Sequence, residues 1–209
     1  PNLAVLVGHS AVRTATMGND AWERETPTDD ELAMMRGMID EAMRQGAVGF
    51  ASSFSINHVG HGGIPMPSTI ATVDEFSHLA EAVGDAGRGI VQMSAGGRGT
   101  VEAMEPIVEK IGRRMFLTTG AAMYNASDPE RGRSWFADCA AAKERGNELY
   151  IQIPCQPLSF DFTMANAYPF FSHSAFDGIK AYSPEQLMSV FKDPAFRDRF
   201  RENLRNPVV

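Results

Sequence analysis

The sequence predicts an α/β fold built from parallel β/α units, and two features of the chain support this. Short apolar runs alternate with amphipathic segments that each end in glycine. None of the runs alternates apolar with polar residues, which is typical of parallel strands covered on both faces. Consecutive strands with a helix between them form βαβ units, which require right-handed crossovers and a parallel sheet.

Five short apolar runs, rich in β-branched or aromatic residues, are the predicted strands. They cover residues 3–7, 48–54, 90–94, 115–119 and 149–153. Each is four to eight residues long, as expected for strands in a buried sheet.

Helix start signals stand between these runs. Thr28 and Glu31 have the spacing of a capping box, in which the Thr hydroxyl and the Glu carboxylate satisfy each other's backbone amides. Gly46 occupies the place of a left-handed C-terminal cap. Thr72 and Glu75 repeat the same opening for a second helix. The buried stripe of the first helix is Leu32, Met35, Ile39, Ala42 and Met43, and neighbouring Met34 and Met38 are also assigned to core packing.

Two more helices complete the β/α alternation. The third carries an apolar stripe before Gly112, and Pro106 is expected to weaken or delay its first turns. The fourth runs from about Ser134 to Arg145. Ser183 and Asp193 each precede a proline, a strong signal for the start of two short helices near the end of the chain.

The domain organisation changes after Pro154. Residues 1–155 hold the β/α units, whereas residues 156–209 form a Phe- and Pro-rich insertion or lid with two short helices. The chain opens on Pro1 and leads directly into an apolar run, so we expect it to be an internal piece of a longer polypeptide.

Composition narrows the function classes. The chain has 209 residues and a formal charge of −7, from 19 Lys and Arg against 26 Asp and Glu. This balance argues against nucleic acid as a partner, because no broad positive surface is available for phosphates. No apolar run is long enough for a membrane span. The two cysteines do not form a disulfide framework, so the expected compartment is the cytoplasm.

The loop after the first strand contains Gly8, His9 and Ser10, an arrangement similar to the nucleophile elbow of serine hydrolases. The match is partial, because Val12 replaces the second glycine and no amphipathic helix is expected to follow at once. A serine hydrolase that uses Ser10 is therefore an alternative function. His9 either contacts substrate or orders its own loop through hydrogen bonds.

Three other loops carry alternative sites. His58 and His61 have a spacing that could bring two imidazoles to one metal, but the glycines around them argue against a helix there. Residues 95–100 form a glycine-rich turn before a helix, a place where phosphate can bind. Cys155 is either a nucleophile or an inert thiol.

Two sequence blocks carry a family resemblance. VLVGHSAVR at residues 5–13, followed by Met17 and Gly18, and AMRQGAVGFASS at residues 42–53 resemble the middle of the N-acyl-D-amino-acid deacylases, or D-aminoacylases, of the amidohydrolase superfamily. Looser matches follow at residues 89–94 and 152–154.

The resemblance implies that residues 1–155 are the central βα units of an incomplete barrel, a partial (β/α)8 TIM-type fold. It implies a parent protein that uses zinc to hydrolyse an acyl amide. Two histidines of the family correspond here to Ser94 and about Gly120. The family's other metal ligands lie outside this chain. Its aromatic substrate contacts correspond to about Ile56 and Ile153. Zinc is thus expected, if anywhere, in the intact parent, and this segment is expected to hold no metal.

The carboxyl ends of parallel strands are the usual ligand-binding edge, so the polar residues there are the candidate substrate contacts. Arg13 is a candidate partner for a substrate carboxylate. The expected partners are a small-molecule substrate and the remaining barrel segments of the parent. A catalytically inactive barrel that only binds a small molecule is a further alternative. The candidate substrate-binding residues are His9, Arg13, Ser52, Ser53, Ser94 and Gln152.

Overall fold

The structure is a computed structural model that describes residues 2–56, 58–60, 64–118, 128–153, 155, 161–167, 170, 173–179 and 182–205. Contacts between residues divide the chain into two compact units. The first unit comprises Pro1–Ser55 and Met66–Cys155, and the second comprises Ile56–Pro65 and Gln156–Val209.

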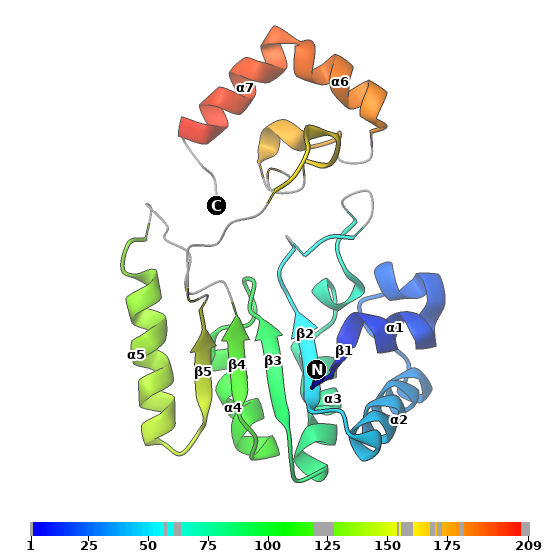
Figure 1. The fold of residues 1–209 in the computed structure, drawn as a ribbon, viewed down its shortest axis with the longest axis vertical. Helices are drawn as coiled ribbons and strands as arrows, with labels where there is room; N and C mark the ends of the chain where they lie inside the picture. The colour runs from blue at the N-terminus through cyan, green and yellow to red at the C-terminus, as the bar shows by residue number, and fades with distance from the viewer. Residues whose placement is uncertain are drawn as a thin grey trace. The chain divides into compact units, whose positions relative to one another are not determined.

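The first unit contains a five-stranded sheet in which every neighbouring pair of strands is parallel. The strand order along the sheet is the order along the chain, β1-β2-β3-β4-β5. The predicted α/β class with parallel β/α units is therefore confirmed (Figure 1). The strands are β1 (Leu6–Gly8), β2 (Gly49–Ser53), β3 (Ile90–Ser94), β4 (Met115–Thr118) and β5 (Leu149–Gln152).

The helices between the strands begin near the predicted cap residues. Thr28 and Glu31 form the full capping box, and Gly46 adopts the left-handed conformation with a φ of 113°. Thr100 caps α4, because its hydroxyl accepts from the Ala103 amide at 3.2 Å. The α-helices of the first unit are α1 (His9–Met17), α2 (Asp29–Gln45), α3 (Val73–Asp85), α4 (Val101–Ile111) and α5 (Arg131–Glu144). The short helices η1 (Gly18–Trp22) and η3 (Pro67–Thr69) join them.

Two expectations about helices were wrong. An α-helix, α1, does follow the first strand at once and begins at His9. Pro106 does not delay α4, which begins at Val101. The proline sits one turn inside the helix, so the hydrogen bond that it removes lies near the N-terminus and the Thr100 cap still starts the helix.

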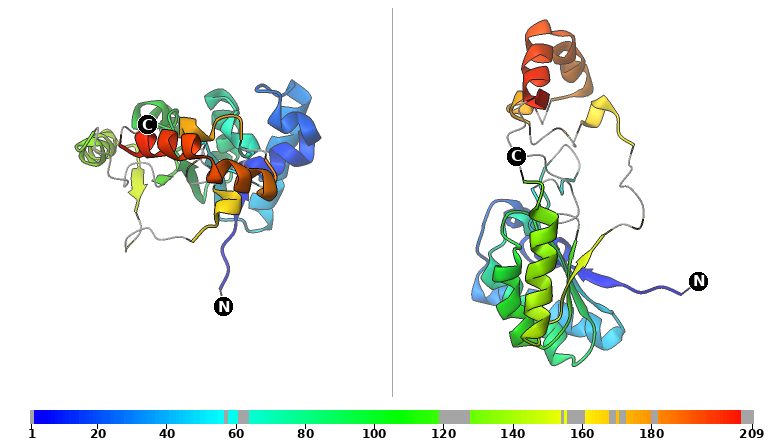
Figure 2. Two further views of the ribbon diagram at one scale, coloured as in Figure 1. Left: turned by 90° about the horizontal axis from the view of Figure 1, so that it is seen from above. Right: turned by 90° about the vertical axis from the view of Figure 1, so that its left-hand side faces the viewer.

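The hydrophobic core of the first unit lies between one face of the sheet and the helices. Strand residues on this face alternate with those on the other, and they are fully buried against the stripes of α2, α3 and α4. The core-facing strand residues include Phe50, Val91, Met93, Met115, Leu117 and Leu149. Figure 2 shows the helices of this unit on one side of the sheet.

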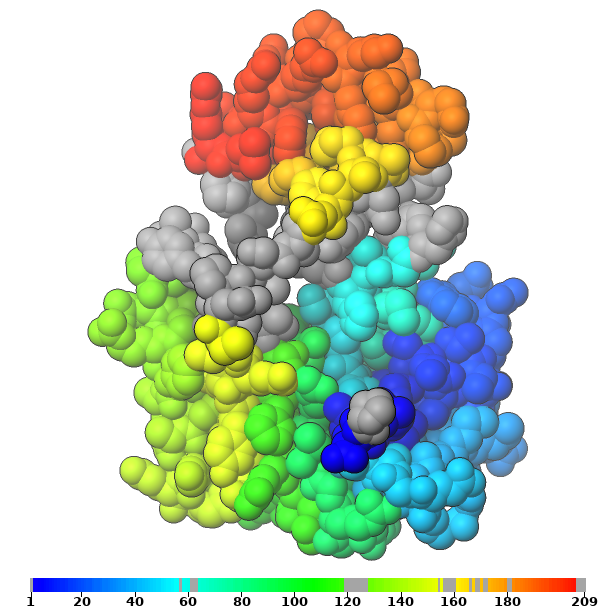
Figure 3. Space-filling view, viewed as in Figure 1, coloured from blue at the N-terminus to red at the C-terminus, as the bar shows by residue number. Residues whose placement is uncertain are grey.

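The opposite face of the sheet carries no residue of this core. Its positions in β2 to β5 are Gly49, Ala51, Ser53, Ile90, Gln92, Ser94, Phe116, Thr118, Tyr150 and Gln152. Figures 1 and 3 view the sheet from this side, and atoms of strands β3 to β5 form part of the molecular surface there. One face of the sheet is therefore packed against helices and the other is not, as in the wall of a barrel.

The methionines of α2 divide between two environments. Met35 and Met43 are fully buried, as their place on the helical stripe predicts. Met34 and Met38 are 55% and 36% exposed, so their assignment to core packing was wrong. They lie outside the buried stripe because a helix turns 100° per residue and only one face of it reaches the sheet.

The second unit holds two short helices, α6 (Pro184–Lys192) and α7 (Pro194–Arg205), and the single turns η4 (Met164–Asn166) and η6 (Ser174–Phe176). The helices begin at the predicted prolines. Ser183 forms a complete capping box with Gln186. Aromatic rings make the core of this unit, with Phe176 in contact with Phe196 and Phe200.

No helix within the described ranges combines the length and the apolar character that crossing a membrane would require.

Candidate functional site

Four polar residues end strands β2 to β5 on the helix-free face of the sheet. The register pairs Ser53 with Ser94, Ser94 with Thr118, and Thr118 with Gln152. Paired residues in a parallel sheet share a face, so the four side chains form one line across the carboxyl ends of the strands. We call Ser53, Ser94, Thr118 and Gln152 the strand-end row.

One hydrogen bond joins two members of the row, and another joins Gln152 to Gln92, which lies below the row. The hydroxyls of Ser94 and Thr118 are 2.8 Å apart. The side-chain amide of Gln92 donates to the Gln152 side-chain carbonyl at 2.8 Å. Below the row, the rings of Phe116 and Tyr150 stack with centroids 5.5 Å apart. The face thus offers neutral hydrogen-bonding groups above an aromatic floor.

The other three candidate residues, His9, Arg13 and Ser52, lie in the layer between the sheet and the helices. Ser52 neighbours Ser53 in the chain, but successive strand residues point to opposite faces. With Glu75 these three form a group that we call the buried polar cluster. The structure thus separates the six candidates into two groups of three. Their role as substrate contacts stays a prediction.

His9 is the centre of the buried polar cluster. Its Nδ1 lies 2.7 Å from the Ser52 hydroxyl, and its Nε2 lies 2.8 Å from a carboxylate oxygen of Glu75. An ionised carboxylate only accepts hydrogen bonds, so Nε2 carries a proton toward Glu75. Nδ1 accepts from the Ser52 hydroxyl when the imidazole is neutral and donates to it when the imidazole is protonated. The order is the serine, histidine and carboxylate chain of nucleophilic enzymes.

Arg13 balances the charge of Glu75. The Arg13 side chain is fully buried, and its guanidinium donates to the second Glu75 carboxylate oxygen. The rest of the guanidinium donates to the backbone carbonyls of Ala21, Arg24 and Glu25. In the structure the partner of Arg13 is therefore Glu75, and its pairing with a substrate carboxylate stays a prediction.

The pKa of Glu75 follows from these contacts. Burial is the largest single influence on the carboxyl group, and it favours the neutral form. The hydrogen bonds and charges of His9 and Arg13 together outweigh burial, so the pKa of Glu75 lies below its ordinary value. The cluster therefore contains an ionised carboxylate in the interior of the first unit.

Sequence reasoning missed the role of Glu75. It expected Glu75 to close a capping box with Thr72, and only half of that box forms. The Thr72 hydroxyl accepts from the Glu75 amide at 3.0 Å, but the carboxylate reaches His9 and Arg13 instead. The signal available in the sequence was the place of Glu75 directly before Phe76, at the edge of the apolar stripe of the helix, where a carboxylate can become buried.

Ser10 has a different environment from the one that a nucleophile needs. Its hydroxyl donates to the Ser68 hydroxyl at 3.0 Å and accepts from the Ser68 amide at 3.1 Å. Both described nitrogen contacts of His9 go to Ser52 and Glu75. Among the described residues, the serine with an imidazole partner is Ser52 and not Ser10.

The remaining candidate loops are placed as follows. His58 is exposed in the second unit, and His61 lies outside the described residues. In the glycine-rich turn, the Arg98 guanidinium donates to the carbonyls of Thr69 and Ala71 and lies 4.6 Å from the Phe54 ring centroid. Cys155 is exposed. Metal, phosphate and thiol chemistry at these loops stay predictions.

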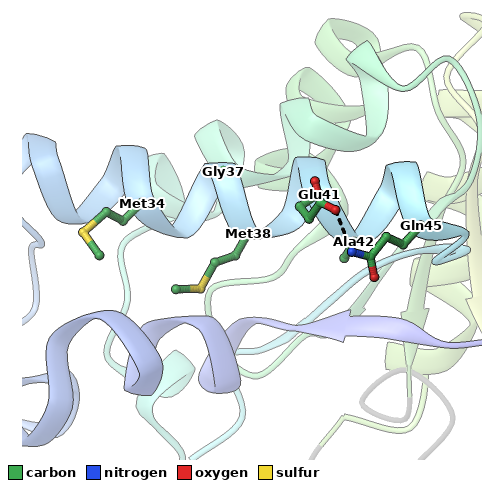
Figure 4. Close-up of a pocket in the computed structure, with 6 residues that line it drawn as sticks. All are labelled: Met34, Gly37, Met38, Glu41, Ala42 and Gln45. Carbon is green, nitrogen blue, oxygen red and sulfur yellow. Dashed lines mark hydrogen bonds between the residues drawn. The ribbon is translucent and has the colours of Figure 1, made fainter.

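A shallow groove of about 480 Å³ runs along α2 (Figure 4). All six lining residues come from this one helix, and the amide of Gln45 donates to Glu41, one turn earlier, at 2.6 Å. The groove lies on the helix and not at the carboxyl ends of the strands, and it contains none of the candidate residues. We do not assign it to the functional site. The lining residues are Met34, Gly37, Met38, Glu41, Ala42 and Gln45.

The side chains of the described residues do not fit a zinc site. Within the described part of the chain, no three His, Cys, Asp or Glu side chains converge as metal ligands would. Zinc in proteins is held by imidazole, thiolate or carboxylate groups. The strand-end row instead presents hydroxyls and an amide. These residues are therefore suited to hydrogen bonding rather than to metal ligation.

Sequence comparisons find similarity to a D-aminoacylase and to an uncharacterized protein. No family model matches it. It is 30% identical to a D-aminoacylase of Alcaligenes xylosoxydans xylosoxydans over 136 residues, which cover 64% of this chain and 25% of that protein. An uncharacterized protein of Mycobacterium tuberculosis is 35% identical over 94 residues, or 42% of this chain and 15% of that protein.

Solved structures of deacylases also resemble this chain. An N-acyl-D-glutamate deacylase from Bordetella bronchiseptica, complexed with zinc and a phosphonate inhibitor, matches with a TM-score of 0.59 and 26% identity. The match covers 75% of this chain and 31% of that one. A D-aminoacylase described as defining a novel subset of amidohydrolases has a TM-score of 0.58 at 20% identity, over 72% of this chain and 30% of that one.

The two solved structures share the parallel β/α fold of the amidohydrolase barrels, and the chain spans about a third or less of the length of each protein compared. The helix-free face and the ordered strands of the first unit agree with one part of such a barrel. The chain therefore resembles one part of the D-aminoacylases and of the related N-acyl-D-glutamate deacylase.

Proposed function

We propose that the protein containing this chain hydrolyses the amide bond of an N-acyl amino acid or a related amide, and that the strand-end row forms one wall of its substrate site. The observation that carries the proposal is the row itself. Its members lie in register at the carboxyl ends of strands β2 to β5, on the face without helices. This is the edge at which barrel enzymes bind their ligands.

The comparisons support the reaction class. The similar proteins are named for the removal of an acyl group from D-amino acids, and one of them was solved with zinc. Zinc would supply an activated water in such a protein. Because the described residues do not fit a zinc site, we assign to this chain binding and orientation of substrate and no step at a metal.

The chemistry available to the row is hydrogen bonding. The Ser94 and Thr118 hydroxyls can each donate or accept, and the Gln152 amide can donate to a substrate carbonyl. Such contacts hold the acyl amide in one orientation and so lower the entropy that is lost on the way to the transition state. Loss of one of them would raise KM, and would lower kcat if the contact strengthens in the transition state.

The buried polar cluster supports this wall from the opposite face of the sheet, the face that packs against the helices. Ser52 precedes Ser53 in strand β2, and His9 and Glu75 hold Ser52 through two hydrogen bonds in series. The end of β2 is thereby tied to α1 and to α3. We assign the cluster a positioning role, because all of its members are buried and contact one another.

The test is amine release from a panel of N-acetyl-D-amino acids by the full-length protein, with the metal content measured on the same sample. We expect turnover by the wild type and a raised KM for Ser94→Ala. Ser134→Ala, at an exposed serine on α5, is the matched control and should match the wild type. Binding of the panel without amine release would favour the alternative of an inactive, small-molecule-binding barrel.

A further inference from the structure

Two glutamine side chains meet on the helix-free face of the sheet. Gln92 comes from β3 and Gln152 from β5, and the amide nitrogen of Gln92 donates to the carbonyl of Gln152 at 2.8 Å across the intervening strand β4. We call this pair the amide clasp. The contact fixes the orientation of both amide groups, since each has a distinct donor end and acceptor end.

The clasp leaves one acceptor and one donor group for a ligand. Within the described part of the chain, the carbonyl oxygen of Gln92 and the amide nitrogen of Gln152 have no hydrogen-bond partner. Gln92 is half-buried and Gln152 is exposed, so both groups are accessible. A ligand with its own donor and acceptor side by side can satisfy both groups at once.

The strand residues around the clasp carry no charge of their own, although two charged side chains from outside these strands contact Tyr150. The ten positions of β2 to β5 on this face are Gly, Ala, Ile, Ser, Thr, Gln, Phe or Tyr. Arg114 and Glu148 pair at 2.9 Å before β4 and β5, and the Glu148 carboxylate also accepts from the Tyr150 hydroxyl at 2.7 Å. On α5, the Lys143 ammonium lies 5.6 Å from the Tyr150 ring centroid.

We propose that the amide clasp is a specificity-determining site that binds an uncharged carboxamide-like group of the substrate and disfavours a carboxylate at the same place. The inference rests on the proposed function and deepens it, because it names the substrate class. A carboxamide donates to Gln92 and accepts from Gln152. A carboxylate has no donor for the Gln92 carbonyl, so a carboxylate oxygen and the Gln92 carbonyl oxygen, both acceptors, would face each other. Neither glutamine carries a positive charge that could pair with the carboxylate.

The substrates that test this differ by one group. N-acetyl-D-glutamine and N-acetyl-D-glutamate have the same length and differ only in carboxamide against carboxylate. A site built to hydrogen-bond one group rejects the analogue that lacks it, because a protein group is then left unpaired. We expect the wild-type protein to prefer the glutamine derivative by about tenfold or more in kcat/KM.

The diagnostic variant is Gln152→Lys in the full-length protein. Lysine replaces the exposed amide donor with a cation, so the preference should shift toward N-acetyl-D-glutamate by about tenfold or more, mainly in KM. Gln45→Lys is the control, because it adds the same charge at an exposed glutamine on α2, away from the sheet edge. It should leave the preference unchanged. Circular dichroism of both variants establishes that they are folded.

The outcomes separate this inference from the proposed function. Hydrolysis that prefers the glutamate derivative, or whose preference Gln152→Lys leaves unchanged, overturns the clasp as a specificity site while the function stands. Absence of hydrolysis of the whole panel overturns the function. In that case calorimetry with the same two compounds decides on the clasp. Tighter binding of N-acetyl-D-glutamine that Gln152→Lys weakens supports it, and equal binding or no binding overturns it.

Discussion

Glu75 and His9 are 66 residues apart in the chain and share a 2.8 Å hydrogen bond inside the first unit. One residue begins α1 and the other lies in the first turn of α3. With Arg13 on the other carboxylate oxygen, the contact joins two helices to the end of strand β2. A buried ion pair of this kind is costly to break, since each partner left behind is an uncompensated charge.

We therefore predict that Glu75→Gln destabilises the protein by roughly 3–5 kcal/mol, measured by urea unfolding. The substitution keeps the size of the side chain and removes its charge, so Arg13 remains buried without a counter-ion. Asp74→Asn is the matched control, at an exposed position in the same helical turn. It should change the free energy of unfolding by less than about 0.5 kcal/mol.

A double variant separates the pair from its surroundings. Arg13→Met combined with Glu75→Leu replaces the whole ion pair with apolar groups of similar volume, and we expect it to be more stable than either single variant. Destabilisation equal to the sum of the two single effects would show that Arg13 and Glu75 do not interact in solution.

The Glu75 carboxylate also predicts a pH dependence. Because the pKa of Glu75 is below its ordinary value in the folded protein, its ionisation contributes stability that is present above the unfolded pKa of about 4.3. This contribution is lost as the pH falls through the folded pKa. The stability advantage of the wild type over Glu75→Gln should therefore shrink below about pH 4. Unfolding curves from pH 7 downwards measure it, and an advantage that grows on acidification contradicts the assignment.

Gly49 at the start of β2 is required by a close approach of two strands. Its φ is 153°, and a Cβ built there would lie 1.9 Å from the carbonyl oxygen of Ile90. Gly49→Ala should cost at least about 2 kcal/mol, because both the strained backbone and the clash oppose it. Gly37→Ala is the contrasting variant. A Cβ at Gly37 meets no atom within 4 Å, so alanine in this helix should stabilise by roughly 0.5–1 kcal/mol. Thermal unfolding compares the two.

Ser10 should not react as an activated serine. Its described hydrogen bonds go to Ser68, and no imidazole is among its partners in the described ranges. A fluorophosphonate probe is expected to leave Ser10 unmodified, as judged by mass spectrometry of the labelled peptide. Labelling that is abolished by Ser10→Ala would revive the serine-hydrolase alternative.

Much of the fold could be predicted from local chemistry. The β-branched and aromatic runs, the Thr28 capping box and the left-handed Gly46 are properties of a few adjacent residues, so the sequence alone located four strands and most helix starts closely. The first strand, expected at residues 3–7, instead spans Leu6–Gly8. The parallel pairing of the strands followed from the alternation of strands with helices. The start of α1 at His9 was missed because no apolar period announces it.

The candidate site could be predicted only in part. The sequence predicted that polar residues at the ends of the strands would lie at one edge of the sheet, because parallel strands bring their carboxyl ends to the same edge. The division of Ser52 from Ser53 depends on which face of β2 the helices cover, and the pairing of Gln92 with Gln152 depends on the register of three strands.

The sequence by itself determined the α/β class, the strand and helix segments and the resemblance to D-aminoacylases, since these are set by patterns within short windows. Only the tertiary structure decided that Glu75 turns away from its expected cap toward His9 and Arg13. The physical reason is that a buried charge must find a partner, and the choice of partner depends on which distant side chains the fold brings within a few ångströms.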